Sequence, residues 1–165
     1  MDSLYNWIVW IHIIGGFTFA LAHGVSAGVA FKLREEREVP RVQALLDLSQ
    51  VATNGMYAGI FVLLGAGVVA AFMAGLWGRG WIWTAIAILV LQFAFMYVRA
   101  SRYFGDVRRA AGQPYFEAGR GTRAGEPPNP ARLGQLLASS RPFEIAGVGY
   151  LGLAAILWLM VMKPF

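Results

Sequence analysis

The sequence has only two histidines, His12 and His23, and both fall in one long apolar stretch near its start. In a helix each residue turns about 100° and rises about 1.5 Å. The two histidines would therefore share one face and lie roughly 16 Å apart along the axis. Imidazole exchanges protons near neutral pH and is the commonest protein ligand for metals. Their placement predicts either a cofactor site or a pair of buried hydrogen bonds.

Haem b is the cofactor that interior histidines of small helical bundles commonly hold. No histidine exists elsewhere in the chain, so methionines at matching depth are the candidates for a second axial ligand. A five-coordinate haem, or a haem shared across a homodimer, would also satisfy the count. The candidate ligand sets are His23 with Met56 or Met96, and His12 with Met73 or Met160.

Three other interpretations use the same residues. Each imidazole could instead hydrogen-bond a backbone carbonyl or a neighbour such as Asn54 or Gln92 and so hold helices together. Histidine and methionine also suit copper, although the chain lacks clustered Met-x-x-Met or Cys-x-x-Cys spacing. A proton relay would need a carboxyl group at mid-membrane depth, and the nearest candidate, Glu144, lies at the inner edge beside Arg141.

The composition explains where such chemistry would take place. Hydrophobic residues make up 58% of the 165 residues and charged residues 14%, against about 45–50% and 25% in globular proteins. A chain of this length forms one domain, here residues 1–165, and could not hide so much apolar surface from water. There is no cysteine, and no phosphate-binding loop or catalytic triad of a soluble enzyme. Lipid is therefore the expected solvent.

Four apolar segments have about the 20 residues that a helix needs to cross a bilayer. The first is not expected to be a cleaved signal peptide, because it is long and Lys32 and Arg34 follow it. The sequence predicts an all-α fold, an integral membrane antiparallel four-helix bundle. Its helices are expected at 4–31, 52–77, 81–109 (within the membrane to about 98) and 143–162.

The basic residues predict the orientation. All but Arg79 and Lys163 of the 14 lysines and arginines lie in residues 32–41 and 99–141. Positive loops stay in the cytoplasm, so we expect both termini outside a bacterial inner membrane, with the tryptophans at the outer boundary. The net charge is +5, but its basic residues lie in two loops and not in one patch, so lipid head groups are the expected partners and nucleic acid is not.

The loops should contain some structure. Short amphipathic cytoplasmic helices are expected at 40–48, starting at a proline, and at 131–139. Between them, the cytoplasmic loop 110–142 is rich in glycine and proline over 113–129 and is expected to be irregular there. Within the segments, pairs such as Gly24 and Gly28 or Gly55 and Gly59 predict close helix packing, or room for a flat cofactor or partner helix.

The first third of the chain resembles a group of small bacterial four-helix membrane proteins. The matching residues are Trp7-Ile-Val-Trp-Ile-His12-Ile-Ile-Gly-Gly, and the stretch from Leu21-Ala-His23-Gly through Phe31-Lys-Leu-Arg to Ala44-Leu-Leu-Asp-Leu-Ser49. The group includes the copper-resistance D-type domain and the haem-dependent four-helix protoporphyrinogen oxidase. The second stretch looks most like uncharacterised members of the group.

The resemblance implies that His12 is a haem ligand. The oxidase also uses basic residues within its later helices, and this chain has none there, so protoporphyrinogen oxidation is not expected. The leading hypothesis is a small membrane redox or accessory subunit that binds haem b for electron transfer. The alternatives are a cofactor-free structural or assembly subunit of a larger membrane complex, and a transporter of a metal or small molecule.

Overall fold

The computed structural model describes residues 2–117 and 120–165, and these are mostly helical. Four helices, each long and apolar enough to cross a membrane, support a multi-pass membrane protein. They are α1 Asp2–Glu35, α2 Val39–Met73, α3 Gly80–Ala110 and α5 Arg141–Met162. The all-α prediction is confirmed.

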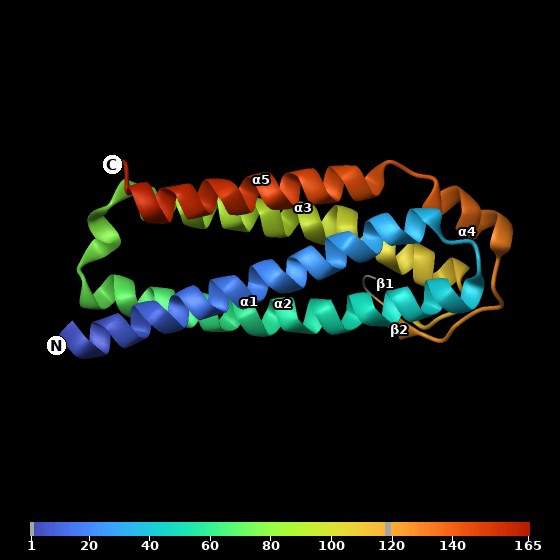
Figure 1. The fold of residues 1–165 in the computed structure, drawn as a ribbon, viewed down its shortest axis with the longest axis horizontal. Coiled ribbons are helices and arrows are strands. Elements are labelled where there is room, and N and C mark those ends of the chain that lie inside the picture. Colours follow the sequence, from blue (N-terminus) through green and yellow to red (C-terminus); the bar gives the residue numbers. More distant parts are fainter. Residues whose placement is uncertain (1, 118–119) are drawn as a thin grey trace.

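Short elements connect the long helices. The 3₁₀ helix η1 (Leu76–Gly78) joins α2 to α3, and the helix α4 (Pro130–Leu137) precedes α5. Between α3 and α4, strands β1 (Tyr115–Glu117) and β2 (Gly121–Arg123) pair in antiparallel register. Figure 1 shows η1 and both chain termini at one end of the molecule, here called the terminal end, and the ribbon and α4 at the other, the hairpin end.

The long helices pack as two pairs, α1 with α2 and α3 with α5, while α2 scarcely touches α3. Glycines set the closest approach within the first pair. A Cβ atom on Gly15 would lie 2.5 Å from the backbone nitrogen of Leu63, and one on Gly59 would lie 2.7 Å from that of Phe19. The packing role predicted for Gly59 is confirmed, whereas Gly28 has no neighbour within 4 Å of such an atom.

Two buried clusters hold the helices together. The cluster at the hairpin end joins all five α-helices through residues such as Leu33, Leu46, Tyr103, Leu137 and Ile145. The cluster at the terminal end joins α2, α3 and α5 around Trp81 and Leu159, with η1 packed against it. The first half of α1 takes no part in either, and the apolar window of α1 is only 11% buried, against 22–28% in the other long helices.

The second predicted segment differs most from the structure. The sequence predicted a short helix at 40–48 separate from a segment at 52–77, but α2 is one continuous helix. Pro40 stands in its first turn, as expected, and no glycine or proline interrupts the chain again before Gly55. The helix ends at Met73 instead of 77 because Gly75 takes a left-handed conformation, with φ of 61°.

The prediction of an irregular loop over 113–129 was wrong for six residues, those of the two short strands. Residues 115–117 and 121–123 form the two-stranded ribbon, with Phe116 opposite Thr122. The short helix expected at 131–139 is α4, which starts at Pro130 because the Asn129 side chain accepts a hydrogen bond from the backbone N–H of Arg132.

Candidate functional site

His12 packs against α2 near the terminal end. Its Nδ1 atom lies 2.7 Å from the carbonyl oxygen of Leu63, and its ring fills the space beside Gly67. A carbonyl can only accept, so Nδ1 carries the proton and donates it, which leaves the lone pair of Nε2 free. Metal-bound histidines commonly have this arrangement, one ring nitrogen donating to a carbonyl and the other binding the metal. The donor chemistry of His12 therefore fits an axial ligand to haem iron.

His23 has a different environment. Its side chain is buried, lies parallel to Phe19, and meets the Tyr150 ring edge-on at 5.4 Å between ring centroids. Its Nε2 atom has no hydrogen-bond partner among the described residues and is directed at the backbone of α5 beside Gly149. Because protein atoms enclose this nitrogen, His23 does not fit an axial ligand as well as His12.

The four candidate methionines fall into two groups. Met56 and Met96 line the same cavity as His23, and the Met96 methyl group lies beside Gly149 close to the His23 ring. Met73 is exposed at the end of α2, and Met160 packs against the cluster at the terminal end. Met56 and Met96, which were expected at the depth of His23, therefore lie around the same cavity. Met73, Met160 and His12 do not line this cavity.

The cavity has a volume of about 590 Å³ and lies between the α1–α2 pair and α3, in the half of the molecule toward the hairpin end. This volume is within the range of about 300–1,000 Å³ that is typical of small-molecule sites. Exposed tyrosines, Tyr57 on α2 and Tyr97 on α3, stand on its lining. The cavity therefore opens sideways between two helices that scarcely touch.

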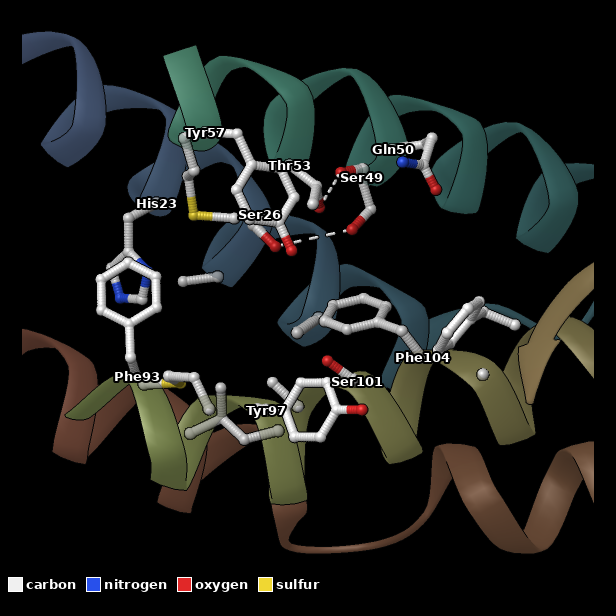
Figure 2. Close-up of a pocket in the computed structure, with 18 of the residues that line it drawn as sticks. His23, Ser26, Ser49, Gln50, Thr53, Tyr57, Phe93, Tyr97, Ser101 and Phe104 are labelled. Atoms are coloured by element: carbon white, nitrogen blue, oxygen red, sulfur yellow. Dashed lines mark hydrogen bonds between the residues drawn. The ribbon is translucent and has the colours of Figure 1, made fainter. Parts of the chain in front are cut away.

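The two long walls of the cavity differ in chemistry, as Figure 2 shows. On the α1–α2 side, the Oγ atoms of Ser26 and Ser49 lie 3.5 Å apart, and the Thr53 hydroxyl donates to the Ser49 carbonyl at 2.9 Å. On the α3 side, the rings of Phe93, Tyr97 and Phe104 line the cavity together with the hydroxyl of Ser101. A ligand would meet more hydroxyl groups on the α1–α2 face and more aromatic rings on the α3 face.

Two polar side chains of α3 add to this lining. Gln92 is buried and donates from Nε2 to the carbonyl of Gly149 at 2.8 Å, while its Oε1 atom has no partner among the described residues. At the hairpin end, the Arg108 guanidinium donates to the Leu46 carbonyl and to Oε1 of Gln113, and lies 3.6 Å from the Asp47 carboxylate. Gln92 was expected to form a hydrogen bond between helices or to a histidine ring, and it forms one between helices, to the Gly149 carbonyl. Arg108 was not singled out from the sequence.

No group of three or more His, Asp or Glu side chains that could hold a metal ion occurs in residues 3–117 and 120–165. A haem would need only one or two protein ligands, so this finding does not bear on haem. Comparison with protein-family models, with curated proteins and with solved structures finds no match to this chain. The resemblance to the four-helix oxidase group stays a prediction.

Proposed function

We propose that the chain is a small multi-pass protein of a bacterial inner membrane, with both termini on the outside. The terminal end holds the chain termini and η1, next to Trp77, Trp81 and Trp83. The hairpin end holds the basic stretches 32–41 and 99–141. Positive residues stay in the cytoplasm and tryptophans favour the interface, which supports an antiparallel four-helix membrane bundle with α4 at the cytoplasmic surface.

Within that setting we propose a redox or accessory subunit that binds haem b through His12. The supporting observation is the hydrogen bond from Nδ1 of His12 to the Leu63 carbonyl, which leaves Nε2 free to bind iron. Bound haem iron would alternate between ferric and ferrous states and so carry one electron. The protein would hold the imidazole ring in place through α2, because Gly67 admits the ring against the helix backbone.

The first experiment is a visible absorption spectrum of the detergent-purified protein, produced with ample haem and recorded before and after dithionite. A Soret band that shifts on reduction is the expected result. His12→Ala should lose the band and His23→Ala should keep it. A colourless wild-type protein would contradict the proposal. Loss of the band only in His23→Ala would show that His23, and not His12, is the haem ligand.

A cofactor-free subunit of a larger membrane complex is the second candidate, and the exposure of α1 favours it. Trp7, Trp10 and Phe17 are each more than half exposed along the half of α1 that joins neither buried cluster. A partner helix would cover this face and bury the aromatic side chains. The test is the size of the tagged protein extracted from its native membrane in mild detergent, where a particle no larger than one chain plus detergent would exclude this candidate.

A further inference from the structure

A second hollow, a cleft of about 370 Å³, lies between α3 and β1 at the hairpin end. It is next to the 590 Å³ cavity, because five lining residues are common to both: Tyr97, Ser101, Gly105, Tyr115 and Phe116. The cavity is lined mainly by apolar and aromatic groups, whereas the cleft has four charged side chains. Together they form one elongated site with an apolar part and a charged part.

The four charged side chains of the cleft, two arginines and two carboxylates, sum to zero, but one of them lacks a partner. Three of its four charged groups have partners of their own: Asp106 with Arg141, Arg109 with Glu126, and Glu117 with Arg120 and Arg123. The fourth, Arg102, is exposed and has no carboxylate partner in the part of the chain that the structure describes. An anionic group placed beside Arg102 would therefore pair with a guanidinium that none of these ion pairs already uses.

The position of Arg102 along α3 matches the head-group region of a bilayer. The apolar part of α3 ends at Val98, and Arg102 follows one helical turn later. The cavity extends from this level toward the middle of the apolar span and opens between Tyr57 and Tyr97, which are 56% and 62% exposed. An amphiphile already in the bilayer could enter sideways, with its apolar part deep and its charged part at the surface.

We propose that this site binds an anionic phospholipid, with the phosphodiester at Arg102 and one acyl chain in the cavity between α2 and α3. The unpaired guanidinium of Arg102 favours an anionic head group, and the aromatic side chains around Phe93 and Phe104 contact the acyl chain. The site is separate from the proposed haem ligand, because His12 does not line either hollow. The lipid would fill the space between two helices that scarcely touch and so stabilise the fold.

The test is thermal unfolding of the full chain in a non-ionic detergent with added dioleoylphosphatidylglycerol or dioleoylphosphatidylcholine. The anionic lipid is expected to raise Tm at lower concentration than the zwitterionic one. Arg102→Gln should weaken the response to phosphatidylglycerol about fivefold, since one basic residue near a membrane surface contributes about 1 kcal/mol. Arg132→Gln is the matched control, because Arg132 is an exposed arginine of α4 outside both hollows, and should leave the response unchanged.

A larger side chain in the cavity tests the acyl part separately. Ala100 lines the cavity from α3, so Ala100→Leu should weaken the responses to both lipids, and Thr53→Leu tests the same space from α2. Circular dichroism establishes that each variant is folded. Equal effects of Arg102→Gln and Arg132→Gln, or unchanged responses in both folded leucine variants, would overturn the proposal. So would equal stabilisation by glycerophosphate alone, which would indicate a site for a small anion.

Discussion

The ring of His23 occupies the space that a side chain at position 149 would fill. A Cβ atom on Gly149 would overlap the Nε2 end of the ring and lie 3.1 Å from the Met96 methyl group. Residues from α1, α3 and α5 therefore meet at one point in the apolar interior. The absence of a side chain at Gly149 is what allows the imidazole to lie there.

We expect Gly149→Ala to destabilise the protein by about 1–3 kcal/mol, because the His23 ring and Met96 would have to move from a packed position. The measurement is the change in Tm in mild detergent. Gly147→Ala is the control on the same helix, since an added Cβ there meets nothing within 4 Å. It should have no destabilising effect, and similar losses in both variants would contradict the packing described here.

Gly59→Ala should separate α1 from α2 and cost about 3 kcal/mol, because the new methyl group would meet the backbone of Phe19, which cannot rotate away. Gly65→Ala, on the same helix with nothing within 4 Å of its Cβ, should be neutral or slightly stabilising. Thermal unfolding of the two variants side by side checks this. A neutral Gly59→Ala would show that the two helices do not cross there.

Gln92 allows a test of its buried amide. Gln92→Met keeps the length of the side chain while removing one hydrogen bond and one unpartnered oxygen, so stability should change by no more than about 1 kcal/mol. Gln92→Glu places a carboxyl group at the same buried position and should cost about 2–3 kcal/mol. Denaturant titration of both variants measures the difference, and equal stabilities would mean that this side chain is accessible to water.

The Glu126 carboxylate gives a prediction for pH. Hydrogen bonds from Arg109 and then Tyr115 lower its pKa below the ordinary 4.5. Because the folded pKa is lowered, these contacts stabilise the ribbon region above pH 4.5 and are lost as the pH falls through the lowered value. A carboxyl carbon NMR titration should show the low pKa, and Arg109→Gln should raise it toward 4.5. An unchanged pKa in that variant would exclude the Arg109 contact in solution, and Arg132→Gln serves as the control.

The long helices could be predicted because apolar runs of membrane length leave few alternatives. The separate helix at 40–48 could not be excluded, because a change from amphipathic to fully apolar sequence resembles a boundary even where no residue breaks the helix. The ribbon was missed because its strands have three residues each and stand among glycines and prolines. The local sequence signal for the ribbon is the short alternation in Tyr115-Phe116-Glu117, followed by Gly121. In the structure this glycine has a positive φ.

The candidate site was predicted less completely than the fold. Depth along each helix follows from counting residues, and Met56 and Met96, which were placed at the depth of His23, line the same cavity as His23. Which helices are neighbours, and which way a ring turns, depend on packing between distant segments. The Leu63 carbonyl that accepts from His12 has no sequence signature, since every residue has one. The place of Arg108 in the cavity depends in the same way on a distant segment, because its guanidinium donates to the Leu46 carbonyl of α2.

The pairing of α1 with α2 and of α3 with α5 also has a consequence for the order of events during synthesis. Only three residues separate α1 from α2, so this pair can form its glycine crossing as soon as both helices have left the ribosome. Helix α3 must wait until the ribbon, α4 and α5 have been made before it finds its main partner. Between those moments α3 stands in the bilayer with its inner face unpaired, which makes this interval the stage most exposed to capture by a chaperone or a protease.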